Sequence, residues 1–370
     1  MNNSNIWPNW LPLRDPLKPM SPYGAPQVPA SAQLNTNENP FAPSPALIAA
    51  ISKRVSEVSE TLNRYPDRDA VALRAGLAKY MTAQTSQSFE VANIWAANGS
   101  NEIIQSIFLA FGRESALGFT PSYSMHPLIA KVTSVKWLDG KRRDDHSLDV
   151  AVAVEQILSA KPTLTFITTP NNPTGSVVKL VEITELSKAA AAVGGLLVVD
   201  EAYAEFSSEA SAATLITEYP NVIVIRTMSK AFAFAGARLG YLIADPVVID
   251  ALQLVRLPYH LSAITQAVAE VALSFSTELL AGVDTLIAQR EIVQAELTKL
   301  GLTITPSAAN FLLFGSFKQP ADQIWHKLLD RGILIRDVGL LGQLRVTIGT
   351  AAENQAFISA LTEVLAEGDK

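Results

Sequence analysis

The sequence predicts an α/β protein: a large domain with a mostly parallel sheet sandwiched by helices, followed by a smaller α+β domain. From about residue 45 to 270, helical patterns alternate with short β-branched runs, as in strands joined by helical crossovers. After about residue 275, longer helical stretches alternate with short strands. The chain has 370 residues, 48% of them hydrophobic, and can bury a sizeable core. We expect an N-terminal arm at 1–33, a large domain at 34–265 and a small domain at 266–370.

Residues 1–33 are expected to form an extended arm. Their density of proline forbids a regular helix or a central strand. The prolines are Pro8, Pro12, Pro16, Pro19, Pro22, Pro26 and Pro29. The first ten residues show no basic stretch followed by an apolar one, so no signal peptide is evident.

Three buried strands are predicted in the large domain, at 164–168, 196–199 and 222–225. Each is an unbroken run of apolar or β-branched residues, as expected of a parallel sheet covered on both faces. Polar residues follow each strand, among them Asp200 and Lys230. Open α/β sheets bind ligands beyond the carboxyl ends of their strands, so we expect these polar side chains to meet there.

The small domain is predicted from a change of pattern near residue 275. Long helical stretches there alternate with short strands, which is typical of an α+β unit. The helices are expected at 279–300, 321–330 and 354–366, and the strands at 302–304, 311–314, 333–335 and 344–347.

Composition excludes several classes of function. The absence of cysteine removes disulfides, thiolate nucleophiles and cysteine-based metal sites. A net charge of -6, with scattered basic residues, argues against binding to nucleic acid or to an anionic membrane. No apolar run reaches the roughly 18 residues of a membrane span. The histidines form no ligand pair at helical spacing, so no metal is expected; they are His126, His146, His260 and His326. We expect a cytoplasmic protein that acts on small molecules.

Lys230 is the candidate for a reactive amine. It stands just beyond a strand among small apolar residues, where desolvation would lower its pKa and favour the nucleophilic neutral form. Arg238 follows eight positions later, and its planar guanidinium can hold a phosphate group. The hydroxyls of Thr227 and Ser229 can add hydrogen bonds to the same group.

The segment Gly99-Ser100-Asn101 is a second candidate for phosphate binding. It precedes an apolar helical pattern at 103–111, and we expect Ser100 to cap that helix. The exposed N–H groups at a helix start bind anions, and Asn101 is expected to line the same site.

Four further residues fit a site for pyridoxal 5′-phosphate (PLP). Such a site needs an amine, an anion beside the pyridine nitrogen, a phosphate cradle and a stacked ring face. Asp200 ends an apolar strand, where an unpaired carboxylate would be costly, and can supply the anion. Tyr203 can reach the same ligand, Asn172 offers a donor to the ring's 3′ oxygen, and Tyr123 offers an aromatic face. Each residue alone is more often structural, but together they predict PLP as the cofactor.

The order of these motifs resembles the fold-type-I, aspartate-aminotransferase-like PLP enzymes. In that family a Gly-Ser helix start, a stacking aromatic, Asn-Pro-x-Gly, Asp-x-x-Tyr, Ser-Lys and Arg follow one another. Here they read Gly99-Ser100, Tyr123, Asn172-Pro-Thr-Gly175, Asp200-Glu-Ala-Tyr203, Ser229-Lys230 and Arg238. The resemblance implies that the large domain binds PLP.

Within this superfamily the chain resembles the histidinol-phosphate aminotransferases, from about residue 11 to the C-terminus. The matching stretches lie at 34–40, 63–67, 169–175, 198–203, 226–238, 306–310 and 344–349. The segment Val255-Arg-Leu-Pro-Tyr-His-Leu-Ser262 resembles the form common among actinobacterial members.

This resemblance also implies partners and substrate contacts. The residue matching Tyr65 reaches the cofactor phosphate of the other subunit, which implies a homodimer with active sites at the interface. Arg345 would hold the acidic group of the substrate, the phosphate of histidinol phosphate or a carboxylate of glutamate, and Arg336 is expected beside it. Tyr23 in the arm could close over the ligand, and Asn37 is expected among the substrate contacts. Read alone, the two arginines are more typical of surface charges.

The expected reaction is a ping-pong exchange of an amino group. Histidinol phosphate and 2-oxoglutarate would give imidazole-acetol phosphate and glutamate, a step of histidine biosynthesis, with Lys230, Asp200 and Tyr203 as the catalytic candidates. The main alternative is an aromatic amino-acid (phenylalanine) aminotransferase, because fold does not decide substrate. Another PLP reaction, such as decarboxylation, and a PLP-binding regulator without catalysis are further alternatives. The regulator would need a DNA-binding domain, for which the arm is too short.

Overall fold

The computed structural model describes residues 7–368. Its larger part is built on a seven-stranded sheet in the order β2-β8-β7-β6-β5-β3-β4, and β8 runs antiparallel to both of its neighbours. The strands are β2 (Ile94–Ala97), β3 (Ser115–Thr120), β4 (Lys136–Lys141), β5 (Leu164–Thr168), β6 (Leu196–Asp200), β7 (Val222–Thr227) and β8 (Gly240–Ile243). The sheet is mostly parallel, which confirms the predicted α/β class.

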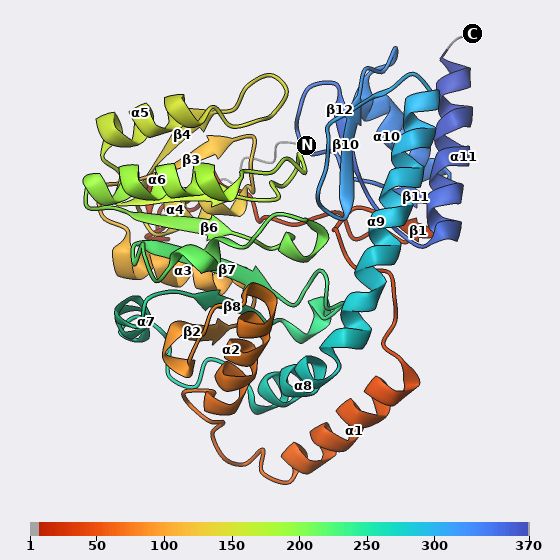
Figure 1. The fold of residues 1–370 in the computed structure, drawn as a ribbon. Coiled ribbons are helices and arrows are strands. Elements are labelled where there is room, and N and C mark those ends of the chain that lie inside the picture. Colours follow the sequence, from red (N-terminus) through yellow and green to blue (C-terminus); the bar gives the residue numbers. More distant parts are fainter. Residues whose placement is uncertain (1–6, 369–370) are drawn as a thin grey trace.

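Helices cover both faces of this sheet (Figure 1). One face packs against α2, α5, α6 and α8, and the other against α3, α4 and α7, in separate apolar cores. On β6, Leu197 and Val199 enter the first core and Val198 the second, as the two-residue period of a strand requires. The helices are α1 (Pro45–Ser59), α2 (Val71–Thr85), α3 (Ser100–Phe111), α4 (Met125–Val132), α5 (Val150–Ala160), α6 (Leu180–Ala192), α7 (Pro246–Gln253) and α8 (Ala263–Ser274).

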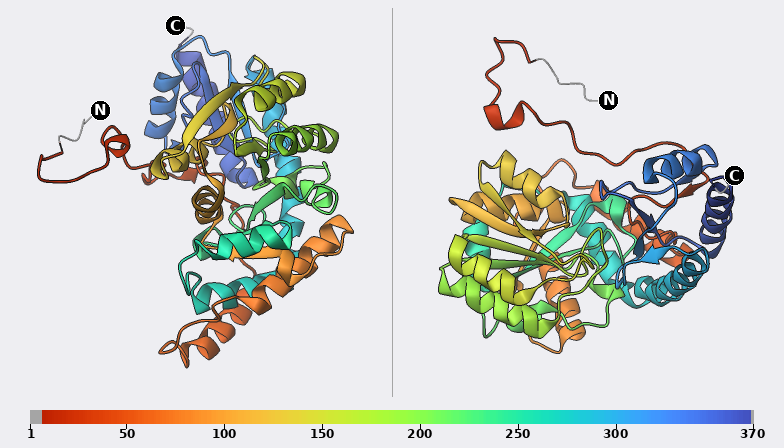
Figure 2. Two further views of the ribbon diagram at one scale, coloured as in Figure 1. Left: turned by 90° about the vertical axis from the view of Figure 1, so that its left-hand side faces the viewer. Right: turned by 90° about the horizontal axis from the view of Figure 1, so that it is seen from above.

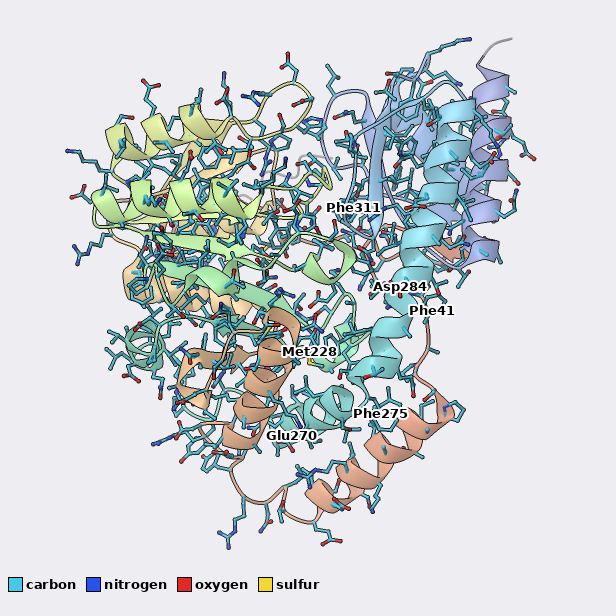
Figure 3. The ribbon with its side chains drawn as sticks, viewed as in Figure 1. Phe41, Met228, Glu270, Phe275, Asp284 and Phe311 are labelled. Carbon is cyan, nitrogen blue, oxygen red and sulfur yellow. The ribbon has the colours of Figure 1, made fainter. Side chains whose placement is uncertain are left out.

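The smaller part is an antiparallel sheet in the order β12-β10-β9, covered by helices. Its core is packed from α9, α10, α11 and the central strand β10, which is buried along its whole length. Figure 3 labels Phe311 at the start of β10, where this core faces the larger part. The elements are α9 (Ser276–Lys299), β9 (Thr303–Ile304), β10 (Phe311–Gly315), α10 (Ala321–Asp330), β12 (Gln343–Thr347) and α11 (Ala351–Glu367).

The strand predicted at 333–335 does not join that antiparallel sheet. The observed strand, β11 (Ile333–Leu334), instead pairs in parallel with β1 (Ala32–Gln33) at the end of the predicted arm. Leu34, next to β1, is buried in the core of the smaller part. The chain therefore passes through the smaller part before it enters α1 in the larger one.

α9 connects the two parts. Val283 and Leu286 belong to the core of the smaller part, whereas Leu279 near the start of the helix packs on the core of the larger part. The division between 265 and 266 stays a prediction. Within residues 7–368 no single helix is long and apolar enough to cross a membrane, although α8 and α9, bent by 72° at their junction, meet that criterion together.

The arm is described from residue 7 onward. Figure 2 shows this segment running away from the body of the molecule, with one short helical turn at Asp15–Leu17. The turn lies against α4, and the Arg14 guanidinium donates hydrogen bonds to the Val132 carbonyl and, over 3.1 Å, to the Ser134 hydroxyl. A cation at the carboxyl end of α4 is favourable because that end carries unpaired carbonyl groups.

Candidate active site

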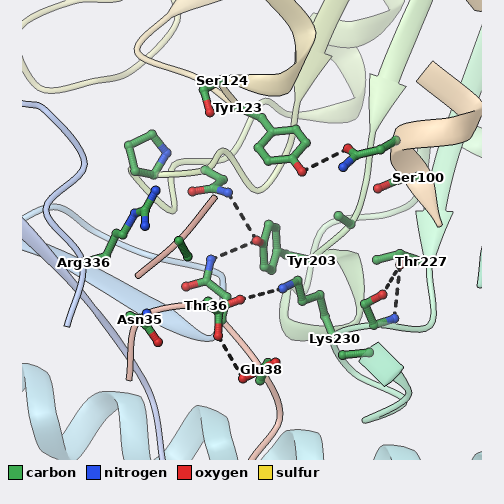
Figure 4. Close-up of a pocket in the computed structure, with 18 of the residues that line it drawn as sticks. Asn35, Thr36, Glu38, Ser100, Tyr123, Ser124, Tyr203, Thr227, Lys230 and Arg336 are labelled. Atoms are coloured by element: carbon green, nitrogen blue, oxygen red, sulfur yellow. Dashed lines mark hydrogen bonds between the residues drawn. The ribbon is translucent and has the colours of Figure 1, made fainter. Parts of the chain in front are cut away.

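A cavity of 680 Å³ lies where the parallel strands end and the smaller part begins (Figure 4). The strand ends, the segment 35–38 and two arginines of the smaller part all contribute to its wall. The cavity brings together the predicted residues Tyr23, Asn37, Ser100, Asn101, Tyr123, Asn172, Asp200, Tyr203, Thr227, Ser229, Lys230, Arg238, Arg336 and Arg345. Tyr65 is the predicted residue that does not line it.

Lys230 presents its amine inside this cavity. Its Nζ donates a hydrogen bond of 2.8 Å to the Thr36 carbonyl and lies 5.9 Å from the centre of the Tyr203 ring. Burial, followed by the positive charges of Arg345 and Arg238, lowers the pKa of Lys230 to about 8, although Glu38 acts in the opposite direction. An amine with this pKa loses its proton readily near neutral pH.

Asp200 is a buried carboxylate at the end of β6, with 2% of its surface exposed. Its Oδ2 lies 3.2 Å from Nε2 of His126, and its Oδ1 accepts a hydrogen bond of 3.2 Å from the Ala202 N–H. His126 is equally buried, on the first turn of α4. In the sequence His126 stands out only as one of the histidines that form no metal-ligand pair, and nothing there signals this contact, since the two residues lie 74 positions apart.

The helix α3 begins differently from the prediction. Gly99, at φ 80° and ψ 168°, is the N-cap, and Ser100 is the first helical residue without a capping hydrogen bond from its side chain. Residue 99 must be small there, because a Cβ on Gly99 would lie 2.7 Å from Nη2 of Arg238. The backbone at the start of α3 can approach the guanidinium because residue 99 is glycine.

This close approach shapes a pocket for an anion. The N–H groups of the first turn of α3 and the Arg238 guanidinium stand side by side, and Arg238 also donates a hydrogen bond of 3.0 Å to the Ala235 carbonyl. Thr227 and Ser229 line the same cavity, where their hydroxyls are 3.1 Å apart. These hydroxyls, the guanidinium and the helix start form the donor set that a phosphate group requires.

Tyr123 lies on the loop between β3 and α4 and lines the cavity. Its hydroxyl donates a hydrogen bond of 3.1 Å to Oδ1 of Asn101, and its ring meets the His126 ring edge to face at 5.4 Å. Burial raises the pKa of Tyr123, so the hydroxyl stays protonated. The ring is fixed at both ends and can stack on a planar ligand.

Tyr203 is the centre of a polar network drawn from separate segments (Figure 4). Its hydroxyl accepts hydrogen bonds of 2.9 Å from Nδ2 of Asn37 and of 3.4 Å from Nδ2 of Asn172. Burial raises the pKa of Tyr203 to about 12, against the opposing effects of Arg345 and Asn37. The hydroxyl therefore keeps its proton and can donate it to a ligand.

Arg345 on β12 carries a buried guanidinium, with 6% of the residue exposed. Nη1 donates a hydrogen bond of 2.5 Å to Oδ1 of Asn172, Nη2 donates one of 2.8 Å to the Asn35 carbonyl, and Nε has no partner among the described residues. The guanidinium lies 5.2 Å from the centre of the Phe311 ring. Burial lowers the pKa of Arg345 to about 10, so it is still a cation at neutral pH.

Arg336 lies directly beside Arg345, as expected. The two residues exchange backbone hydrogen bonds of 2.9 Å in an isolated bridge, although β11 itself has ended at Leu334. Both side chains line the cavity. Two adjacent cations, one with an unpaired buried N–H, are suited to bind an anion.

Two predicted tyrosines lie on outer surfaces. Tyr23 in the arm lines the cavity and is about half exposed. Tyr65 is 79% exposed and stacks on Tyr259, with ring centres 4.3 Å apart. Tyr65 does not line the cavity described above, and its role in a partner subunit stays a prediction.

Comparison with known proteins identifies the family. Residues 31–361 match the model of aminotransferase class I and II. The chain belongs to this family. It is 55% identical to the histidinol-phosphate aminotransferase of Mycolicibacterium smegmatis over 357 residues, which cover 96% of this chain and 93% of that protein.

Solved structures agree in fold. A histidinol-phosphate aminotransferase from Sinorhizobium meliloti, in complex with pyridoxal-5'-phosphate, matches with a TM-score of 0.81 and 25% identity, covering 92% of each chain. An aspartate aminotransferase from Thermus thermophilus matches with a TM-score of 0.80 and 20% identity, covering 96% of this chain and 99% of that one. The predicted fold type and family are thus confirmed.

Proposed function

We propose that this aminotransferase exchanges the amino group of L-histidinol phosphate with 2-oxoglutarate. The products are imidazole-acetol phosphate and L-glutamate, in a ping-pong reaction of histidine biosynthesis. The observation that carries the proposal is one cavity that holds a partly buried amine, a buried carboxylate and a buried guanidinium whose Nε has no partner among the described residues. The 55% identity with a histidinol-phosphate aminotransferase supports the choice of substrate.

The cavity fits PLP as the cofactor. The Lys230 amine would hold its aldehyde, Asp200 its pyridine nitrogen and Tyr123 its ring face. Ser100, Asn101, Thr227, Ser229 and Arg238 would hold its phosphate. The fit rests on Gly99, since any side chain there would occupy the space that Arg238 needs beside the start of α3. When bound, PLP accepts the amino group of the substrate and withdraws electrons from the carbon that carried it.

Lys230 is the proton carrier in this proposal. With a pKa near 8 its Nζ can take a proton from the substrate's α-carbon as a general base and return it as a general acid. Without cofactor, the hydrogen bond to the Thr36 carbonyl holds the amine on the cavity wall. His126 orients the Asp200 carboxylate, and both side chains are shielded from water.

Arg345 and Arg336 would bind the acidic group of either substrate. Asn172 links Arg345 to the Tyr203 hydroxyl, so the acid-binding guanidinium and the polar centre of the cavity are held at a fixed separation. Asn37 fixes the same hydroxyl from the opposite segment. Tyr23, on the arm, would cover the bound substrate and exclude water.

The remaining features of the proposal concern assembly. We infer that the protein is a homodimer in which the exposed Tyr65 reaches the cofactor phosphate of the partner subunit. We also infer that it acts in the cytoplasm. The division into an arm, a large domain and a small domain at residues 33 and 265 belongs to this proposal. Sedimentation of the purified protein tests the dimer, and limited proteolysis at the proposed boundaries tests the domain division.

Substrate preference tests the proposed activity. The purified enzyme is assayed with 2-oxoglutarate and either histidinol phosphate or phenylalanine, and kcat/KM is compared. We expect histidinol phosphate to be preferred, because Arg345 and Arg336 provide two positive charges for a phosphate. A tenfold preference for phenylalanine would make the protein an aromatic amino-acid aminotransferase. Failure to form the pyridoxamine cofactor with histidinol phosphate would exclude transamination of this substrate.

A further inference from the structure

Three acidic side chains line the cavity among the described residues: Glu38, Asp200 and Asp337. Asp200 is buried against His126 at the end of β6. Asp337 accepts a hydrogen bond of 2.8 Å from the Gly339 N–H within its own turn. Glu38 thus has no part in the reaction as proposed, although it lies two residues from Thr36, whose carbonyl accepts the hydrogen bond from the Lys230 amine.

Glu38 is positioned close to the reacting amine. Its Oε2 accepts a hydrogen bond of 2.9 Å from the Thr36 hydroxyl, and the carbonyl of that same Thr36 accepts the Lys230 amine at 2.8 Å. Glu38 also favours the charged form of Lys230, whereas burial and Arg345 lower the pKa of this lysine. The Glu38 carboxylate and the Lys230 amine thus both contact Thr36 on the cavity wall.

Glu38 and Arg336 lie at different places on the cavity wall. Figure 4 draws Arg336 and Glu38 well apart, with Thr36 between them. A substrate whose acidic group is held by Arg336 and Arg345 therefore directs its other substituent away from these cations. In histidinol phosphate that other substituent is an imidazole, whose ring N–H donates a hydrogen bond.

Building on the proposed function, we infer that Glu38 recognises the imidazole ring of the substrate and determines specificity for it. The carboxylate accepts the ring N–H, and this contact favours histidinol phosphate over phenylalanine, whose ring offers no donor. For glutamate the same carboxylate supplies no attraction, since both side chains carry negative charge. One side of the cavity thus serves both substrates through their acids, and the other side distinguishes them.

The two half-reactions provide an internal control for this inference. Glu38→Gln keeps the shape of the side chain and removes its charge, and Glu38 is solvent-exposed, so the fold should tolerate the change. Wild-type enzyme and Glu38→Gln are mixed separately with histidinol phosphate, glutamate and phenylalanine. The conversion of the cofactor is followed by absorbance. Equal cofactor absorbance before mixing shows that both proteins are equally loaded.

We expect the second-order rate constant for histidinol phosphate to fall at least fivefold in Glu38→Gln. The constants for glutamate and phenylalanine should stay within twofold of wild type or rise. An unchanged constant for histidinol phosphate overturns the inference, and so does a parallel fall for all three substrates, because that pattern assigns Glu38 to Lys230 rather than to the ring. Wild-type enzyme that fails to react with histidinol phosphate instead refutes the proposed function.

Asp337→Asn is the matched control for charge. It removes one negative charge from the same cavity, next to Arg336 in the sequence, and Asp337 is not among the charges that act on Lys230. We expect the ratio of the histidinol phosphate to glutamate constants to stay at the wild-type value. If Asp337→Asn lowers this ratio as much as Glu38→Gln does, general charge in the cavity decides the preference, and the inference about Glu38 is wrong.

Discussion

Replacement of Arg345 by lysine separates the positive charge of this side chain from its fork geometry. In the structure Nη1 and Nη2 bind Asn172 and Asn35, and Nε is buried without a partner among the described residues. Lysine retains a cation but cannot make the two parallel hydrogen bonds that a planar guanidinium offers to an acid. We therefore expect the variant to bind substrate acids less well in both half-reactions.

The size of the effect follows from the hydrogen bonds at stake. A hydrogen bond to a charged group contributes about 1.5–3 kcal/mol. The loss of one such bond in the transition state lowers kcat/KM by about 10- to 150-fold, since each 1.36 kcal/mol is a factor of ten. Arg336→Lys should cost less, because Arg336 is only partly buried and solvent screens its charge.

The assay is steady-state kcat/KM with histidinol phosphate and with glutamate, together with the absorbance of the bound cofactor. We expect both constants to fall by a similar factor while the absorbance stays the same, because Arg345 donates its hydrogen bonds to Asn172 and Asn35 and not to the residues of the phosphate pocket. Constants within threefold of wild type for both substrates would refute Arg345 as the acid-binding residue. A loss of bound cofactor would show that the side chain acts on the fold of the cavity instead.

Three further predictions concern the cofactor cradle, the amine and the arm. Gly99→Ala should weaken PLP retention at least tenfold, because the new Cβ would lie 2.7 Å from Nη2 of Arg238; an unchanged dissociation constant contradicts this. In the cofactor-free protein the folded-state pKa of Lys230 is about 8, below the ordinary value of 10.5. Between pH 8 and pH 10.5 the unfolded state therefore binds more protons than the folded state, and the free energy of unfolding rises with pH. Urea unfolding should show this rise, at most roughly 3 kcal/mol, in wild type but not in Lys230→Met. Arg14→Ala should free the arm from α4, loosen Tyr23 and raise KM for histidinol phosphate severalfold with little change in kcat; an unaltered KM would exclude a role for this anchor.

Much of the larger part could be predicted from local sequence. The runs that form β5, β6 and β7 are mostly apolar because both faces of the sheet are covered, and β6 and β7 end in buried polar residues, Asp200 and Thr227. Asp200 and Lys230 follow two of these strands, so their convergence at one edge of the sheet could be anticipated from chain order. The helix α10 was predicted with its observed bounds, 321–330.

Contacts between distant segments could not be predicted in this way. The pairing of β1 with β11 joins residues about 300 positions apart, and short strands carry no signal that selects a partner. His126 lies on a helix that reads as amphipathic, and only the fold brings it to Asp200. Propensity favoured Ser100 as the N-cap of α3, but Gly99 is the N-cap. Arg238 approaches Gly99 from a distant segment, a contact that propensity does not reveal.

The central claim, that Lys230 holds the cofactor, is tested by finding the residue to which the cofactor is attached. Purified protein is reduced with borohydride, digested, and analysed by mass spectrometry for a lysine that carries the pyridoxyl phosphate group. We expect this modification on Lys230, one per chain, and its absence when histidinol phosphate has first converted the cofactor to its amine form. A modification on another lysine, or one on Lys230 that persists after histidinol phosphate is added, would contradict it.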